Sequence, residues 1–226
     1  MATTFQRARS EEQRALRSQA ILDTAAAMLQ EMPVADISLN ELSRRVGLAK
    51  SNVLRYFDSR EAVLLELLAR SFREWLEHLA AVLPTSVRAR AGFKRRAEEL
   101  ATAIAQSLAE RPVLCDLMGA QAGVLEHNVS VETVTEYKLA ALADAEVFVG
   151  LVRSALPELS EDDAWRYTVG AWVLTSALWA HARPAAAVLE ACAADPRLER
   201  AHLDFAVTLE DYLTTLAIGL HARAAE

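Results

Sequence analysis

The segment from Ile37 to Phe57 reads ISLNELSRRVGLAKSNVLRYF, and its caps and apolar spacings decide the fold. Ser38 followed three residues later by Glu41 is a capping box, which predicts that a helix begins there. This helix has one apolar face at helical spacing, formed by Leu39, Leu42 and Val46. Gly47 predicts its end, because glycine adopts the left-handed closing conformation without strain. Ser43 is small where two helices must cross closely.

A second helix is predicted after Gly47. Its apolar anchors are Leu48, Val53 and Phe57. The side chains left outward are polar or basic: Lys50, Ser51, Asn52, Arg55 and Tyr56. Such side chains hydrogen-bond phosphates and the edges of bases. The segment therefore predicts a helix-turn-helix that binds DNA.

The flanking residues make the prediction more specific. The stretch from about Leu16 to Leu68 resembles the N-terminal domain of the tetracycline-repressor (TetR) family. The resemblance rests on an apolar first helix, the Gly-Leu turn, the Arg-Tyr-Phe end at residues 55–57 and the Ser-Arg-Glu restart at residues 59–61. It covers about a quarter of the chain, and the remainder matches the family in length and helical character. Leu54 departs from the phosphate-contacting tyrosine usual in the family, and Ala49 stands where a serine often caps the recognition helix.

The resemblance implies a helix-turn-helix domain over residues 1–60 and a helical ligand-binding and dimerisation domain over residues 61–226. Two recognition helices would then enter successive major grooves of a palindromic operator. The candidate phosphate contacts are Ser38, Arg44, Lys50, Arg55 and Arg60. The residues expected nearest the base edges are Ser51, Asn52 and Tyr56, and Arg55 could play either part.

Charge and composition agree with a DNA-binding head on an acidic body. The 226 residues carry a net charge of −7, but the first 60 hold nine basic against seven acidic residues, a net +2, which leaves −9 for the rest. No apolar run approaches the roughly 18 residues of a membrane span. Glu11 and Glu12 follow the first arginines without an apolar region, so we expect no signal peptide and no membrane. Cys115 and Cys192 are expected as buried side chains in a reducing cytoplasm, with neither metal nor cofactor.

The rest of the chain predicts helices separated by proline and glycine boundaries. Their expected ranges are 59–82, 86–110, 113–124, 130–156, 160–181, 184–193 and 196–221. The first of these is capped by Asp58 or Ser59 and stops before Pro84. It begins in the head and ends in the body without a flexible linker, so it can carry a displacement between them. Altogether the pattern predicts an all-α chain of nine or ten helices.

Trp165, Trp172 and Trp179 recur every seven residues and form one stripe along the helix over 160–181. The stripe is either core packing or a face that spans core, ligand pocket and subunit interface. Small residues beside it would admit a neighbouring helix: Ala164, Gly170, Ala171 and Ala177. The family resemblance implies a homodimer formed by the last two long helices. We expect the pocket for a hydrophobic or aromatic inducer to be lined by Trp75, Cys115, Met118, Tyr137, Trp172, Ser176 and Trp179.

Two other classes of protein remain as alternatives: a helical enzyme, and a helical adaptor without specific DNA binding. Glu199 and His202 have the Glu-x-x-His spacing of di-iron bundles, but such a site needs that motif twice with two further carboxylates. No phosphate loop or nucleophile elbow occurs. A basic cluster at residues 88–96 is either a second nucleic-acid surface or, as we favour, a solvated face balanced by Glu98 and Glu99. The sequence thus predicts a ligand-responsive transcriptional regulator, with repression as the favoured action.

Overall fold

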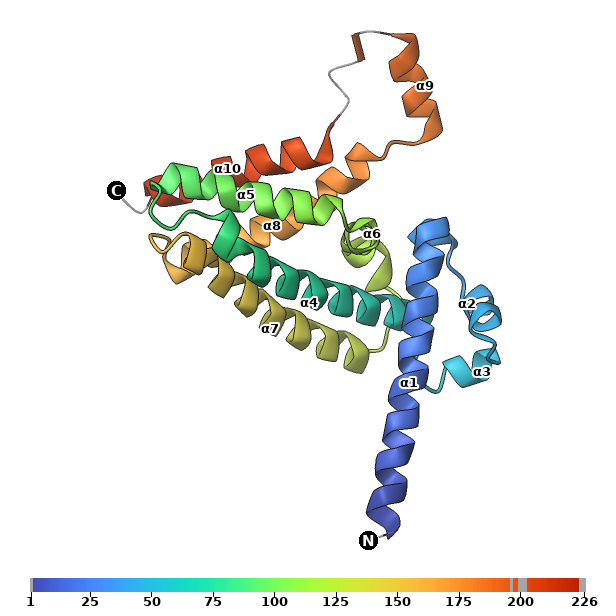
Figure 1. The fold of residues 1–226 in the computed structure, drawn as a ribbon. Coiled ribbons are helices and arrows are strands. Elements are labelled where there is room, and N and C mark those ends of the chain that lie inside the picture. The colour runs from blue at the N-terminus through green and yellow to red at the C-terminus, as the bar shows by residue number, and fades with distance from the viewer. Residues whose placement is uncertain (1, 196, 199–202, 224–226) are drawn as a thin grey trace. The chain divides into compact units, whose positions relative to one another are not determined.

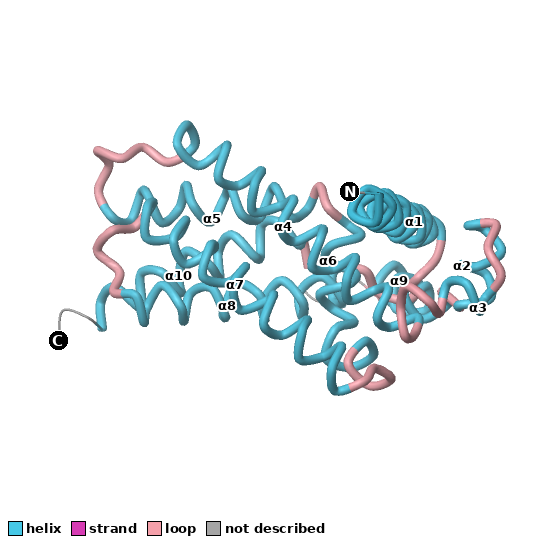
Figure 2. The backbone as a smooth tube through the Cα atoms, turned by 90° about the horizontal axis from the view of Figure 1, so that it is seen from below, coloured by secondary structure: helices cyan, strands magenta, loops and turns pink. Residues whose placement is uncertain are grey.

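The computed structural model describes residues 2–195, 197–198 and 203–223, and these form ten α-helices without a strand (Figures 1 and 2). The predicted all-α fold is confirmed. The helices are α1 Ala2–Glu31, α2 Leu39–Val46, α3 Lys50–Val53, α4 Arg60–Ser86, α5 Phe93–Ala109, α6 Pro112–Ala120, α7 Val131–Ala155, α8 Glu161–Ala182, α9 Ala186–Ala194 and α10 Phe205–Arg223. A 3-10 turn at Val34–Asp36 precedes α2, and a π-helical turn at Gln121–Leu125 follows α6.

The chain forms two compact units. The head unit comprises Met1–Arg70 together with Ala120–Lys138, and the body unit comprises Ser71–Gly119 together with Leu139–Glu226. Helix α4 crosses from one unit to the other at Arg70 without a break. The functional boundary at residues 60 and 61 stays a prediction.

The core of the head is built where α2 packs against α1 and α3. Ser43 is buried at this crossing, and its hydroxyl donates to the Leu39 carbonyl at 2.7 Å. Gly47 closes α2 with φ +74°, in the left-handed region. The amide of Gly47 donates to Arg44 O at 3.2 Å and that of Leu48 to Ser43 O at 3.0 Å. These are the two bonds of a Schellman motif, so the predicted turn is confirmed.

The head unit is completed by the start of α7. Asp58 accepts hydrogen bonds from the hydroxyls of Ser130 at 3.2 Å and Thr133 at 2.9 Å. Ser130 also caps α7, because its hydroxyl oxygen accepts from the Thr133 amide at 3.1 Å. Asp58 therefore serves as an anchor for α7, and Ser59 caps α4 by accepting from the Ala62 amide at 3.1 Å. We call Asp58, Ser130 and Thr133 the α7 anchor.

In the body unit, α10 packs against α5 and α8. The predicted close approach at the small residues occurs at Gly170, where a Cβ would lie 2.5 Å from Leu216 Cδ2. Arg96 of α5 is buried and donates to the carbonyls of Ala91 and Ala155 at 3.0 and 2.9 Å and to the Glu158 carboxylate. The hydrogen bond from Arg96 lowers the pKa of Glu158.

Part of the basic cluster at residues 88–96 is balanced by carboxylates on the surface. Arg88 and Arg95 both donate to Glu99, at 2.6 and 3.0 Å between Nε and Oε1. Arg96 is the exception, since it is a buried structural residue and no part of a solvated face. These bonds pair three of the five basic residues, whereas Arg90 and Lys94 are exposed and have no partner among the described residues.

Several helix boundaries differ from their predicted positions. Helix α4 continues through Pro84 to Ser86, because a proline in the last turn removes one hydrogen bond and the Val87 amide still reaches Leu83 O at 2.9 Å. Helix α5 begins at Phe93, after an extended Gly92, instead of at residue 86. Helix α10 begins at Phe205, with Asp204 accepting from the Val207 amide at 2.9 Å. The predicted start at Pro196 lies outside the described residues, as does the Glu199–His202 pair.

Candidate functional site

Helix α3 presents its polar side chains to solvent. Lys50, Ser51 and Asn52 are exposed, while Val53 on the opposite side is fully buried. Arg55 is exposed and Tyr56 half-buried just after the helix. Within the described part of the chain, none of these polar side chains makes a hydrogen bond or ion pair. Exposed side chains of these types can contact phosphates and base edges.

Three further predicted contacts are already engaged within the head. Ser38 caps α2 by accepting from the Glu41 amide at 3.1 Å, as predicted. The Glu41 carboxylate does not complete the capping box but accepts from Arg44 and Arg45, whose hydrogen bonds lower its pKa to about 2. Arg60 donates to Ile37 O at 2.9 Å and pairs with Glu61 at 2.8 Å, which leaves it fewer N–H groups for a phosphate. Their contacts with DNA stay predictions.

The two departures from the family pattern have local consequences. Ala49 has an extended backbone at the start of α3 and gives no side-chain cap. The Asn52 amide instead donates to Ala49 O at 2.8 Å, so one helix-end donor is satisfied by the backbone. Leu54 is 41% exposed, which makes it a surface residue of the head.

A groove of about 320 Å³ lies between α1 and the end of α3, lined by Gln13, Arg14, Arg17, Arg55 and Tyr56. Arg14 and Arg17 are not among the predicted DNA contacts. Their three-residue spacing on one helix face was the available signal. What it lacked was the proximity of Arg55, which comes from tertiary packing.

In the body unit, four aromatic side chains from three helices form a cluster. Phe72 of α4 lies 5.1 Å from Trp172 of α8 and 5.3 Å from Trp75, between ring centroids. Trp75 lies edge-on to Phe148 of α7 at 5.1 Å, and its indole N–H donates to Ser107 at 2.9 Å. The structure therefore joins two predicted pocket residues, Trp75 and Trp172, through Phe72.

The remaining predicted pocket residues are distributed over the fold. Ser176 donates to Trp172 O at 2.9 Å. Trp179 donates to Asp116 at 2.7 Å and meets Phe205 edge-on at 4.9 Å. Cys115 and Met118 of α6 are buried, and burial raises the pKa of the Cys115 thiol to about 12. Tyr137 belongs to the head unit, whereas the other six belong to the body unit. Cys192, predicted as buried, is half-exposed on α9, which buries no side chain.

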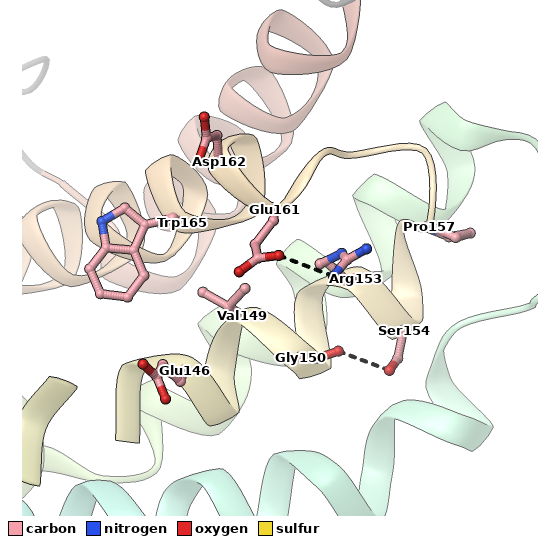
Figure 3. A pocket seen from close by; sticks show the side chains of 9 residues that line it. All are labelled: Glu146, Val149, Gly150, Arg153, Ser154, Pro157, Glu161, Asp162 and Trp165. Atoms are coloured by element: carbon pink, nitrogen blue, oxygen red, sulfur yellow. Dashed lines mark hydrogen bonds and ion pairs between the residues drawn. The ribbon is translucent and has the colours of Figure 1, made fainter. Parts of the chain in front are cut away.

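The three tryptophans of α8 occupy different environments. Trp165 is 37% exposed and borders a groove of about 820 Å³ between α7 and the start of α8. Figure 3 shows its ring beside Val149 and Glu146, with Arg153 and Glu161 further along the groove, 3.9 Å apart. None of the predicted pocket residues lines this groove. The stripe thus runs from a surface groove through the aromatic cluster to the Asp116 contact.

Two family patterns match the chain. Residues 21–67 match the pattern of the bacterial regulatory proteins of the tetR family. Residues 69–224 match the tetracyclin repressor-like C-terminal domain, which covers more than half of the chain. The chain belongs to the TetR family. It is therefore a DNA-binding transcriptional regulator. Transcriptional regulators are not a class of enzymes.

Similar proteins agree with membership of the TetR family. The regulator EthR of Mycobacterium tuberculosis is 46% identical over 54 residues, which span 24% of this chain and 25% of EthR. A possible TetR family regulator from Streptomyces coelicolor has the same fold at 21% identity, with a TM-score of 0.56 over 94% of this chain and 100% of that one. FadR from Bacillus subtilis, solved with stearoyl-CoA, is 12% identical with a TM-score of 0.52 over 88% of this chain and 96% of FadR.

In the described residues, no group of three or more His, Cys, Asp or Glu side chains is arranged to hold a metal ion. In the same residues, no helix has the length and apolar character needed to cross a membrane.

Proposed function

We propose that this TetR-family regulator is a homodimeric repressor that acts in the cytoplasm and leaves a palindromic operator when an apolar or aromatic inducer binds. The observation that carries the proposal is helix α3. Its outward side chains Lys50, Ser51 and Asn52 are exposed and make no hydrogen bond elsewhere in the described protein. Residues without a role inside the head are available for DNA.

The dimer is supported by apolar side chains left exposed on α8 and α10. On α8, Trp165, Val169 and Val173 follow one another every four residues and are 37–57% exposed. On α10, Val207 and Tyr212 are 67% and 46% exposed. Since apolar stripes of this kind mark interaction surfaces, we assign them to a second copy of the chain. Two identical heads would then meet two half-sites related by a dyad.

The inducer site is supported by the body interior. Phe72, Trp75, Phe148 and Trp172 supply an apolar wall. On α8, which also carries Trp172, the buried hydroxyl oxygens of Tyr167, Thr168 and Thr175 have no hydrogen-bond partner in the described residues. A buried hydroxyl without a partner is unfavourable, so a ligand group that bonds with it gains affinity. This favours an apolar molecule with one or two hydrogen-bonding functions.

Coupling between inducer and operator would pass through α4, which runs from Arg60 in the head to Ser86 in the body. If the inducer favours a form whose heads are wrongly spaced, operator and inducer must weaken each other by the same factor. A hundredfold loss of operator affinity corresponds to about 2.7 kcal/mol of coupling.

A gel-shift selection with genomic fragments tests the proposal, followed by footprinting of the retained fragment. We expect a retained palindrome with both half-sites protected, and release of the fragment by apolar aromatic compounds. Protection of one half-site would contradict the dimer. Equal retardation of all fragments would contradict the recognition of a specific operator. Retention that no class of ligand relieves would contradict the proposed inducer.

A further inference from the structure

The head-unit arginines between residues 12 and 70, whose side chains the structure describes, fall into two groups. One group donates to carboxylates or carbonyls of the same unit: Arg44, Arg45, Arg60 and Arg70. The other group, Arg14, Arg17 and Arg55, is exposed and makes no such bond within the described residues. The second group is also the one that meets in a single groove.

Among the described residues that line it, the groove has positive charge and no carboxylate to balance that charge. Its lining residues are three arginines, one glutamine and one tyrosine. Like charges brought together repel each other, and the repulsion is relieved when an anion binds between them. Arginine guanidinium groups bind phosphate oxygens through two parallel hydrogen bonds, which suits a tetrahedral anion.

The size of the groove favours more than a bare ion. Its volume of about 320 Å³ is roughly ten times the volume of one water molecule in the liquid. A phosphodiester with an attached sugar fits such a space. The hydroxyl of Tyr56 and the amide of Gln13 add uncharged groups that suit sugar and ester oxygens.

We propose that this groove holds a backbone phosphate of the operator, with Arg14 and Arg17 of α1 and Arg55 after α3 as its ligands. The proposal rests on the proposed operator binding and extends it to α1. Arg55 and Tyr56 follow α3 within three residues, so the phosphate lies beside the bases that α3 contacts. Arg55 was predicted to contact either a phosphate or a base edge, and this proposal assigns it to the phosphate.

The test is the double variant Arg14→Ala, Arg17→Ala, with Arg90→Ala as the matched control. Arg90 is an exposed arginine of the body unit without a described partner, so its loss removes one positive charge, half of what the double variant loses, at a site outside the groove. Fluorescence anisotropy of the operator and of a random duplex is measured over a range of salt concentrations, and circular dichroism checks folding. A second double variant, Arg14→Lys, Arg17→Lys, keeps the charge but not the paired N–H groups.

We expect the alanine variant to bind operator and random duplex about tenfold more weakly, by the same factor for both. The slope of log affinity against log salt should fall by about 0.9 for the phosphate lost. The lysine variant should keep the wild-type slope and lose affinity, while Arg90→Ala should match the wild type. If the wild type binds the operator and the alanine variant has the same affinity and the same salt slope, this site is overturned and the proposed function stays intact.

The source of the phosphate is tested by calorimetry with inorganic phosphate at constant ionic strength. No saturable heat is expected, because the groove needs the DNA to deliver its ligand. Saturable binding that disappears in the alanine variant and competes with the duplex would overturn the assignment to DNA and indicate a site for a free phosphate ester. A wild type that binds no duplex at all would refute the proposed function itself.

Discussion

Replacing Gly47 with alanine tests the turn that positions α3. At φ +74°, an alanine costs about 1–2 kcal/mol relative to glycine. The restricted unfolded chain offsets about 0.4–1 kcal/mol of this. No heavy atom lies within 4 Å of the added Cβ, so the penalty is one of backbone conformation alone. We therefore expect Gly47→Ala to lower the free energy of unfolding by about 1 kcal/mol and to weaken DNA binding, since the turn orients the exposed side chains.

Gly150 provides the matched control. It lies inside α7, has no positive φ, and its added Cβ would also meet nothing within 4 Å. Alanine there should raise the unfolding free energy by about 0.5–1 kcal/mol, because glycine is a poor helix former. Since 1 kcal/mol shifts the melting temperature by about 2–4 °C in a chain of this size, the two variants should melt roughly 3–8 °C apart, in opposite directions from the wild type.

The assay is thermal and urea unfolding followed by circular dichroism at one fixed protein concentration, because the stability of a dimer depends on concentration. Gly47→Asn should fall between wild type and Gly47→Ala, since asparagine tolerates the left-handed region better. A Gly47→Ala protein as stable as Gly150→Ala would refute the left-handed closure of α2. If the variant is destabilised but its DNA affinity is unchanged, the turn does not control the orientation of α3.

Four other outcomes are expected. Arg55→Ala should weaken operator and random duplex equally if the guanidinium holds phosphate, whereas a loss of about 1–3 kcal/mol confined to the operator would indicate a guanine contact; anisotropy distinguishes them. Leu54→Tyr should strengthen binding to both duplexes with an unchanged salt slope, since a neutral hydroxyl releases few counterions, and weaker binding would assign Leu54 to the core. Ser176→Phe should give either permanent repression or a folded dimer that ignores its operator, and a wild-type response in a gel shift would place the inducer elsewhere. The hydrogen bond from Arg96 holds the pKa of Glu158 below its ordinary value of 4.5, so this pair contributes stability that is present above pH 4.5 and lost as the pH falls through the lowered pKa. Glu158→Gln should therefore make the free energy of urea unfolding depend less on pH in the acid range. A pH profile identical to that of the wild type would contradict the pairing.

Local sequence signals predicted the caps and turns of this fold. Ser38 caps α2 through an amide three residues away, and Gly47 closes α2 through bonds that span three and five residues. Such contacts depend on spacing that can be read directly. The exposed side chains of α3 were predictable for the same reason, since periodicity alone separates Val53 from Lys50.

Contacts between distant residues escaped prediction. Arg60 resembles a free cation in sequence, yet its acceptor is the carbonyl of Ile37, 23 positions away. The same holds for Arg96, whose acceptor Ala155 is 59 positions away. A backbone carbonyl leaves no trace in residue type, so no pattern distinguishes these arginines from Arg14 and Arg17. Pro84 was expected to end the helix, but its missing amide costs α4 one hydrogen bond and the helix continues to Ser86.

The α7 anchor has a consequence for the order in which the protein is made. Asp58 lies 72 and 75 positions before its partners Ser130 and Thr133. At the roughly 5–20 residues added per second during translation, about 4–15 s separate the synthesis of Asp58 from that of Ser130 and Thr133. During this interval the nascent chain has a complete α3 but lacks the segment that completes its own unit. A message truncated before residue 130 would yield a chain that contains α3 and Asp58 but lacks both hydrogen-bond donors of the α7 anchor.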